Sequence, residues 1–184
     1  MASLARFLEG GAFGVMNDIL SEFHSDNGYA IPNRFEVLIT PPGASSADSR
    51  KVSMRCETVL LPGRNLNTTT DSMPYGPTRE VVDGVTYAED IAMTFQASSG
   101  LDERVFFEEW QELAFNKQTW NVGYYNDYVS TVEIYLLDRQ DQRRYGIKLI
   151  EAFPKTINGT DLSQAANNEI IKTSVSFSFR YWES

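Results

Sequence analysis

The clearest pattern of polar and apolar positions lies at the C-terminal end of the chain. From residue 171 to residue 181, larger or apolar residues alternate strictly with small or charged ones. Because side chains alternate across a strand, this pattern predicts one long strand with a core face and a polar face. A terminal strand frays unless something pairs with it, so we expect this one to be paired. Its core face is Ile171, Thr173, Val175, Phe177, Phe179 and Tyr181, and its polar face is Lys172, Ser174, Ser176, Ser178 and Arg180.

Alternation of the same kind predicts five further strands. Their expected ranges are 33–39, Lys51–Val59, 89–97, Thr131–Leu137 and Tyr145–Glu151. The inward positions of the first three strands are Phe35, Val37, Ile39, Val52, Met54, Cys56, Ile91, Met93 and Phe95. A single cysteine on an apolar strand face is more typical of a small buried hydrophobe than of a nucleophile, and we interpret Cys56 in that way.

Two segments have helical spacing instead. Residues 3–24 place apolar side chains near helical spacing, but three glycines weaken the middle, so we expect a broken helix that needs a partner. Residues 98–117 predict a well-formed helix that Ser98 or Ser99 can cap, with Asp102 and Glu103 in the first turn, where the helix dipole favours acids. The expected buried stripe of this helix is Leu101, Val105, Phe106, Trp110 and Leu113.

Residues 64–88 form the one long stretch without a packing pattern. Loops longer than about 12 to 15 residues are uncommon and are usually functional or disordered. Within this stretch, Asp83-Gly84 stands between β-branched residues, which is a strong signal for a two-residue hairpin turn. We therefore expect a protruding hairpin arm, which has nothing of its own to cover it and should contact a neighbour.

These elements predict a mainly β protein. We expect two packed antiparallel sheets, as a sandwich or barrel, with one packed α-helix and a long protruding hairpin loop. The expected core residues are Phe35, Val37, Ile39, Phe95, Trp110, Val175, Phe177 and Phe179.

Length and charge narrow the class of protein. A chain of 184 residues is about one domain and can bury a core without disulfides. A single cysteine gives no internal disulfide and no zinc-binding spacing, which suits a reducing compartment. No apolar run approaches the ~18 residues of a membrane span, so we expect no membrane insertion. The net charge of −9 argues against wrapping nucleic acid by neutralising phosphates.

The inventory of reactive groups is thin. The one histidine, His24, lies at the end of the first expected helix and has no partner in sequence for nucleophilic catalysis. The adjacent acids Glu108 and Glu109 face different directions on a helix and are more typical of a solvated face than of an acid–base pair. No glycine-rich phosphate loop is present. We therefore expect no enzyme, and no catalytic, cofactor-binding or metal-binding residues.

Four stretches of the chain together resemble one family, the tail tube proteins of T-even-like contractile-tailed bacteriophages. In order, the stretches are IPNRFEVLI (31–39), RCETVLLPG (55–63), ERVFFEEWQ (103–111) and NNEIIKTSVSFSFRYWE (167–183). Two departures are a longer N-terminal leader and Gln164-Ala165, where relatives often carry an aromatic residue and an acid. The resemblance implies a tail-tube β domain over residues 29–184. The helical spacing described above adds a helical extension over residues 1–28.

The resemblance also implies an assembly. Subunits of this family form hexameric rings that stack into a tube, with the sheath protein outside, baseplate proteins at one end, and the tape measure protein and genomic DNA in the lumen. The location implied is the virion tail, after assembly in the host cytoplasm. In a closed ring each sheet edge pairs with that of a neighbour, which would protect the long closing strand.

Two surfaces gain a role from this assembly. The arm would reach the next ring and become ordered on stacking through Thr68, Thr69, Thr70, Val81, Val82, Asp83 and Gly84. An acidic or small polar lining would let DNA slide without sticking, and the candidates are Glu133, Ser174, Ser176 and Ser178.

Other roles of the same fold stay open. A tube-like baseplate initiator, a tail terminator or the tube of a contractile injection system would share it. A β-sandwich carbohydrate-binding module would need exposed aromatics near loops, and residues 118–128 offer Trp120, Tyr124, Tyr125 and Tyr128. These aromatics more simply cover the sandwich edge or an interface.

Overall fold

A computed structural model describes residues 21, 29–43, 46–72, 76–87, 90–160, 162–163 and 169–184. The helix expected over residues 3–24, with His24, lies outside the described residues apart from position 21, and so do residues 164–165. The strands are β1 (Phe35–Thr40), β2 (Cys56–Val59), β3 (Arg64–Asp71), β4 (Arg79–Tyr87), β5 (Asp90–Gln96), β6 (Ser130–Leu137), β7 (Arg143–Ile157), β8 (Lys172–Ser178) and β9 (Tyr181–Glu183). The helices are α2 (Ser46–Met54), α3 (Asp102–Ala114) and the short α4 (Tyr125–Tyr128).

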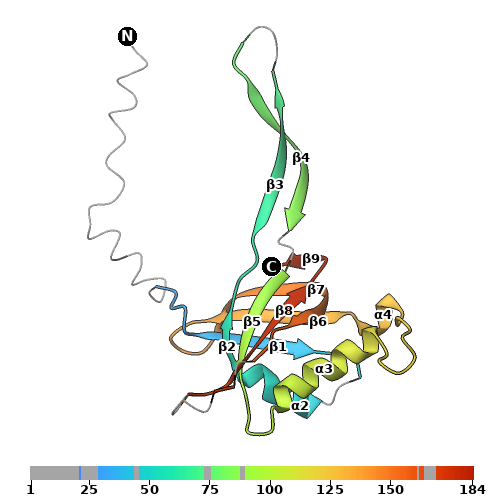
Figure 1. The fold of residues 1–184 in the computed structure, drawn as a ribbon. Helices are drawn as coiled ribbons and strands as arrows, with labels where there is room; N and C mark the ends of the chain where they lie inside the picture. Colours follow the sequence, from blue (N-terminus) through green and yellow to red (C-terminus); the bar gives the residue numbers. More distant parts are fainter. Residues whose placement is uncertain are drawn as a thin grey trace.

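The predicted mainly β fold is confirmed (Figure 1). One seven-stranded antiparallel sheet has the order β1-β6-β7-β8-β5-β2, with β9 paired to β7, and β3 and β4 form a separate two-stranded sheet. The 15-residue strand β7 pairs with β6 along its first part and with β8 along its last part. The two expected sheets are therefore the two halves of one continuous sheet, joined through β7.

Both halves and α3 contribute to a single hydrophobic core. Phe107 lies with its ring centroid 4.9 Å from that of Phe95 and 5.8 Å from that of Phe177, and the rings of Trp110 and Phe177 are 6.0 Å apart. Burial at this density supplies most of the stability of a domain of this size. Phe35 packs against the core and is only partly buried, whereas the other expected core residues are buried: Val37, Ile39, Phe95, Trp110, Val175, Phe177 and Phe179.

The C-terminal alternation is split between two strands. β8 ends at Ser178, and the chain turns before β9, where the Arg180 N–H donates to the Ile150 carbonyl at 3.1 Å. β8 also lies between β5 and β7, so both of its neighbours belong to its own chain. The expectation that this strand lies at an edge and needs a neighbouring subunit is therefore wrong. Among the described strands of this sheet, β1, β2 and the short β9 each pair with a single neighbour and are its edges. Sequence order could not reveal the central place of β8, because Thr94 of β5 and Ser174 of β8 are 80 residues apart.

The strand predicted over Lys51–Val59 is wrong in its first part. Its first part is the end of α2, and only β2 remains extended. Val52 is buried, the Ser53 hydroxyl accepts the Ile39 N–H at 3.1 Å, and Met54 is 76% exposed. Three alternating apolar residues are too few to separate a strand from a helix, and contact with β1 decides for the helix here.

The helix α3 is shorter than expected and buries a different stripe. Its buried residues are Glu103, Phe106, Phe107 and Trp110, whereas Val105 and Leu113 are 48% and 44% exposed. Neither Ser98 nor Ser99 is the N-cap residue, because that position is Leu101, which makes no side-chain capping bond. The Ser98 hydroxyl nevertheless accepts the Asp102 N–H at 3.0 Å from outside the helix.

Candidate functional site

The arm is a two-stranded ribbon that extends beyond the ends of strands β2 and β5. β3 follows β2, and β4 leads into β5, so the paired strands β2 and β5 extend into the paired strands β3 and β4. Figure 1 shows the ribbon standing away from the rest of the protein. Pairing runs from Arg64 with Tyr87 to Asp71 with Arg79. The hairpin turn predicted at Asp83-Gly84 is therefore wrong, since β4 passes through these residues and the strands reverse within residues 72–78.

Asp83 instead forms a β-bulge. Asn67 pairs with Gly84 and Thr68 with Val82, which leaves Asp83 without an opposite residue. The extra residue shifts the alternation of β4, so that Val82 and Val85 lie on the same face although they are three positions apart. Leu66, which is paired with Val85, adds to that face. The bulge thus makes the arm amphipathic.

The apolar face of the arm is exposed. Leu66 is 61%, Val82 56% and Val85 48% exposed. Thr68 shares their face and donates to the Glu80 carboxylate at 3.2 Å. No element of the described chain covers these side chains, and an apolar ribbon of this kind marks a contact surface.

Hydrogen bonds link the strands across the other face. Asn67 and Thr86 exchange two bonds of 2.8 and 3.0 Å, and the Thr69 hydroxyl donates to the Asp83 carboxylate at 2.7 Å. These side-chain pairs hold the ribbon together without a core. Thr69 and Val81 are opposite one another, and both lie on this face.

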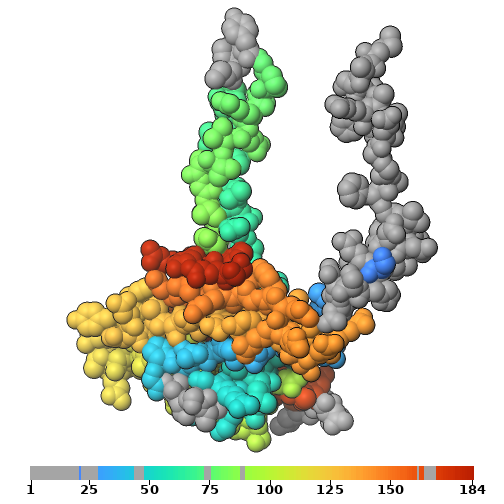
Figure 2. All heavy atoms as spheres, turned by 180° about the vertical axis from the view of Figure 1, so that it is seen from behind, coloured from blue at the N-terminus to red at the C-terminus, as the bar shows by residue number. Residues whose placement is uncertain are grey.

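The foot of the arm rests on the C-terminal strand. The Arg64 guanidinium lies 5.3 Å from the Trp182 ring centroid, and the Tyr87 ring meets Trp182 edge to face at 6.1 Å. The Trp182 indole N–H also reaches the Gly63 carbonyl at 3.5 Å. Figure 2 shows the C-terminal residues, in red, across the base of the green arm. The aromatic end of the chain therefore helps to set the direction of the arm.

The candidate lumen serines lie on the face of β8 that points away from the core. Ser174, Ser176 and Ser178 are partly buried, and the Ser174 and Thr94 hydroxyls are 3.3 Å apart. Ion pairs border this small polar face at both ends, Lys172 with Glu57 at 2.6 Å and Lys155 with Asp90 at 2.8 Å. Among the described residues, one oxygen each of Glu57 and Asp90 is buried without a hydrogen bond, as is the Thr173 hydroxyl.

Glu133 lies on the other half of the sheet, on β6. It pairs with Lys148 at 3.5 Å and accepts the Tyr135 hydroxyl at 2.8 Å, a bond that raises the pKa of Tyr135. Because the two halves share one core, the outward face of β6 and that of β8 are different surfaces. The structure does not bring Glu133 together with the serines.

The aromatic segment over residues 118–128 is divided. Tyr128 packs edge to face on Phe153 at 5.3 Å and accepts the Trp110 indole N–H at 2.7 Å through its carbonyl. Trp120 and Tyr124, however, are 76% and 84% exposed, so they do not cover the edge of their own sheet.

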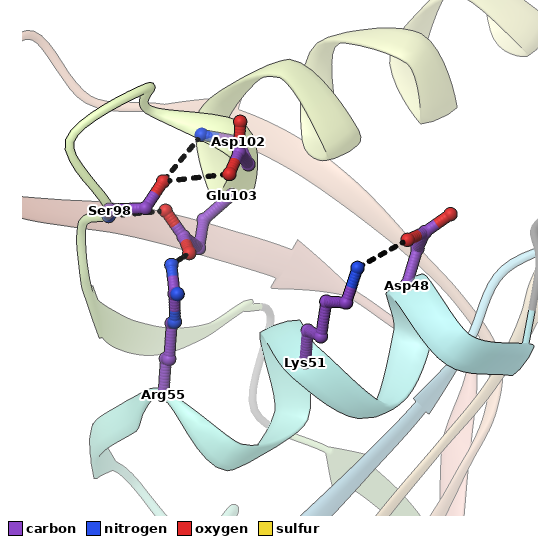
Figure 3. A network of polar contacts seen from close by, with 6 residues as sticks. All are labelled: Asp48, Lys51, Arg55, Ser98, Asp102 and Glu103. Carbon is purple, nitrogen blue, oxygen red and sulfur yellow. Dashed lines mark hydrogen bonds and ion pairs between the residues drawn. The ribbon is translucent and has the colours of Figure 1, made fainter.

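Glu103 is a structural residue that the sequence pattern missed. It is 1% exposed, accepts the Ser98 N–H at 2.8 Å and pairs with Arg55 (Figure 3). Its neighbour Asp102 is exposed, as expected of a first-turn acid. The available signal was the serine five residues ahead of Glu103, which lies outside the usual capping-box spacing.

Cys56 has the properties of a core residue. It packs against the core, and its thiol donates to the Thr58 carbonyl at 3.5 Å. Burial raises the pKa of the Cys56 thiol to about 12. Such a thiol is inert as a nucleophile at neutral pH.

Two further kinds of site were sought in the described part of the chain. No group of three or more histidine, cysteine, aspartate or glutamate side chains is arranged there to hold a metal ion. No described helix is both long enough and apolar enough to cross a membrane.

A mainly β domain with a protruding, exposed amphipathic ribbon is typical of a protein that assembles with neighbouring subunits. Residues 30–184 match the model of the phage tail tube protein family, and the chain belongs to that family. It is accordingly a structural component of a phage tail and not an enzyme. Among curated protein sequences, none matches this chain.

Solved structures share the fold at low sequence identity. The chain is similar to one in a sheath–tube complex of the PVC extracellular contractile injection system in its extended state. The TM-score there is 0.60 at 12% identity, over 92% of this chain and 97% of that one. A chain of the anti-feeding prophage baseplate gives a TM-score of 0.58 at 13% identity, over 84% and 94%. One in the tube-terminating cap of the anti-feeding prophage gives 0.59 at 16% identity, over 84% and 90%.

Proposed function

We propose that the chain is the repeating subunit of a tail tube inside a contractile sheath. Copies form hexameric rings, the rings stack through the arm, and the lumen conducts DNA at ejection. The observation that carries this proposal is the amphipathic arm, which exposes Leu66, Val82 and Val85 on one face. Burial of such an exposed apolar face against a neighbour is favourable, so this face marks a contact surface.

Stacking follows from the direction of the arm. The ribbon leaves the sheet in line with β2 and β5, and the contacts of Trp182 at its foot hold it in that direction. A rigid projection of this kind suits a socket in the next ring, because little conformational entropy is lost on docking. The residues Thr68 to Thr70 and Val81 to Gly84 then lie within the ring-to-ring contact.

The charges and polar groups on the surface favour a lumen to which DNA does not adhere. We assign the lining to the serine face of β8, where cationic groups at the border are held in ion pairs with Glu57 and Asp90. A net charge of −9 per subunit repels a phosphate backbone and opposes adhesion. Glu133 belongs to a different surface and is a second, separate candidate for the lining.

The sheath, baseplate and tape measure partners and the virion location extend the proposal to the assembled tail. Similar folds occur in a sheath–tube complex, a baseplate and a terminating cap, so fold alone does not select among these positions. The way in which the purified protein assembles distinguishes these positions. A repeating subunit should polymerise without limit, whereas an initiator or terminator should stop at single rings, and a carbohydrate-binding module should stay monomeric.

The decisive experiment pairs electron microscopy of the purified protein with an arm variant. We expect long tubes from the native chain. In the variant, residues 66–85 are replaced by a short glycine-containing turn that joins the paired residues Asn65 and Thr86. This subunit should remain soluble and β-rich by circular dichroism but should not elongate. Tubes of normal length from the variant would refute the role of the arm.

A further inference from the structure

An ordered, exposed aromatic tip follows α3. A β-bridge joins Phe115 to Val122, and the Asn116 side-chain oxygen accepts the N–H groups of Gln118 and Thr119 at 2.9 and 3.0 Å. The Trp120 N–H donates to the Asn116 carbonyl at 2.9 Å. The loop over residues 115–124, which we name the aromatic tip, therefore has a defined shape.

The aromatic tip presents its large side chains to the outside at a conformational cost. Trp120 has φ of 59°, in the left-handed region that bulky residues rarely adopt. Gly123 is pressed against α3, since a Cβ there would lie 2.3 Å from the Leu113 carbonyl oxygen. The result is exposure of 76% for Trp120, 76% for Val122 and 84% for Tyr124. The Trp120 ring meets Phe115 edge to face at 5.6 Å, and the rest of it lies in solvent. Strain that holds a largely exposed aromatic side chain in place indicates a contact surface.

An apolar groove lies elsewhere on the domain. It has a volume of about 530 Å³ and is lined mainly by Ala30, Ile31, Pro32, Val59, Leu60 and Leu61. Its lining also includes Glu57, whose carboxylate pairs with Lys172. Leu60 and Leu61 are 63% and 46% exposed at its rim. A groove of this size can hold one or two aromatic side chains.

The tip and the groove lie at opposite ends of the domain. In Figure 1 the segment around α4 is at the right, and residues 29–34, in blue, are at the left. Figure 2, from behind, shows the yellow segment at the left and the blue residues near the groove toward the right. The arm stands across this axis, so a contact along it is separate from stacking.

Charge at the two ends is complementary. Near the tip, residues 108–127 carry four acids against one base. Beside the groove, residues 29–36 and 137–144 carry four arginines against three acids, in a chain whose net charge is −9. Arg34 pairs with Asp141 at 2.7 Å and Arg143 with Glu36 at 2.8 Å, which draws both segments together at that end. Opposite charge favours tip against groove and opposes contacts between two like ends.

We propose that the aromatic tip of one copy seats in the apolar groove of the next copy, head to tail around the ring. The contact is heterologous, and repeated at a constant angle it closes into a ring. Trp120 and Tyr124 are its anchors, and Leu60 and Leu61 are the rim that receives them. This inference rests on the proposed ring and names the surfaces that build it.

Cross-linking of assembled protein tests the contact directly. The double variant Val122→Cys with Leu60→Cys is treated with a short bis-maleimide. Native Cys56 should react slowly, because its thiol is partly buried and its pKa is raised to about 12. We expect a ladder of linked subunits in denaturing gels. The matched control is Val105→Cys with Leu60→Cys, since Val105 is a similarly apolar position, 48% exposed, outside the tip. No ladder from the first pair, or an equal ladder from the second, would overturn the proposal.

Trp120→Ala supplies an assembly readout. Truncation of an interface anchor should raise the subunit concentration needed for rings by about thirtyfold or more. The melting temperature of the subunit should be unchanged, because Trp120 is exposed. Native assembly should also shift tryptophan emission to the blue, and the variant should lack most of this shift.

The outcomes separate the two proposals. If the native protein forms no rings, both the proposed function and this contact are overturned. If native rings form and Trp120→Ala rings form at the same concentration, only the contact is overturned. In the variant Leu8→Cys with Leu60→Cys, a cross-link within monomers would assign the groove to residues 1–28 and would also overturn the proposed contact.

Discussion

The Arg55 guanidinium and the buried Glu103 carboxylate form an ion pair that joins the end of α2 to the first turn of α3. The second Glu103 oxygen accepts the Ser98 N–H at 2.8 Å, and the Gln96 N–H donates to the Arg55 carbonyl at 2.9 Å. One acid therefore ties the helix start to the β2–β5 region from which the arm extends (Figure 3).

Removal of Arg55 should be costly. Arg55→Ala leaves the Glu103 carboxylate buried without its cation, and we expect a loss of about 2 to 4 kcal/mol of unfolding free energy. Lys51→Ala is the control, because Lys51 and Asp48 form an exposed pair at 3.4 Å that should contribute less than about 1 kcal/mol. Urea denaturation of the subunit measures both. Equal losses would show that Glu103 does not depend on Arg55.

The register of β8 can be tested with adjacent residues. Phe177 is fully buried against Phe107 and Trp110, so Phe177→Ala should cost about 3 to 5 kcal/mol. At about 2 to 4 °C per kcal/mol, the melting temperature should fall by roughly 6 to 20 °C. Ser176→Ala on the outward face should change the melting temperature by only a few degrees. A comparable fall from both variants would contradict the assigned register.

The direction of the arm should depend on Trp182. Trp182→Ala removes the edge contact with Tyr87 and the ring beneath Arg64. Trp182 packs against the core from outside and is only partly buried, so the buried core residues themselves are unchanged. We expect a folded subunit whose tubes are shorter and less regular in electron micrographs. Tyr181→Phe is a conservative control in the same strand. Regular, full-length tubes from Trp182→Ala would mean that the arm is oriented by other contacts.

A positive charge in the lumen should slow DNA. Ser176→Lys, on the face of β8 that we assign to the lining, should leave tubes intact but slow DNA ejection, most strongly at low salt. Glu133→Lys tests the other surface separately. If only Glu133→Lys slows ejection, the lining is the β6 face. Normal ejection at low ionic strength from both variants would place other residues in the lumen.

Cys56 should be protected from thiol reagents. With its pKa raised to about 12 from 9.0, its thiolate fraction at pH 8 is about a thousandfold lower than that of an unperturbed thiol. We expect labelling by a disulfide reagent to proceed only as the chain unfolds. Because the folded pKa is the higher one, this group destabilises the fold as pH rises above about 9, where the unfolded thiol ionises first. Rapid labelling at pH 8 in native buffer would disprove the assigned burial.

Sequence patterning was sufficient for the elements with strong local periodicity. Alternation identified the inward residues of β1, β5 and β8, since a half-buried strand must alternate wherever it lies in a sheet. It failed at α2, where Val52, Met54 and Cys56 fit a strand equally well and contact with β1 decides. It also placed Val105 and Leu113 in the core, because helical spacing shows an apolar stripe but not the width of the surface that covers it.

By itself, the sequence determined that this protein is mainly β and acidic, and that it carries a long segment over residues 64–88 that it cannot bury. Only the tertiary structure decided that β8 is a central strand, that Asp83 is a bulge and that Glu103 is buried. It also decided that the tip and the groove lie at opposite ends. The physical reason is range: periodicity and turn chemistry act over a few residues, whereas pairing order, ion pairs and exposed surfaces depend on contacts between segments far apart in the chain.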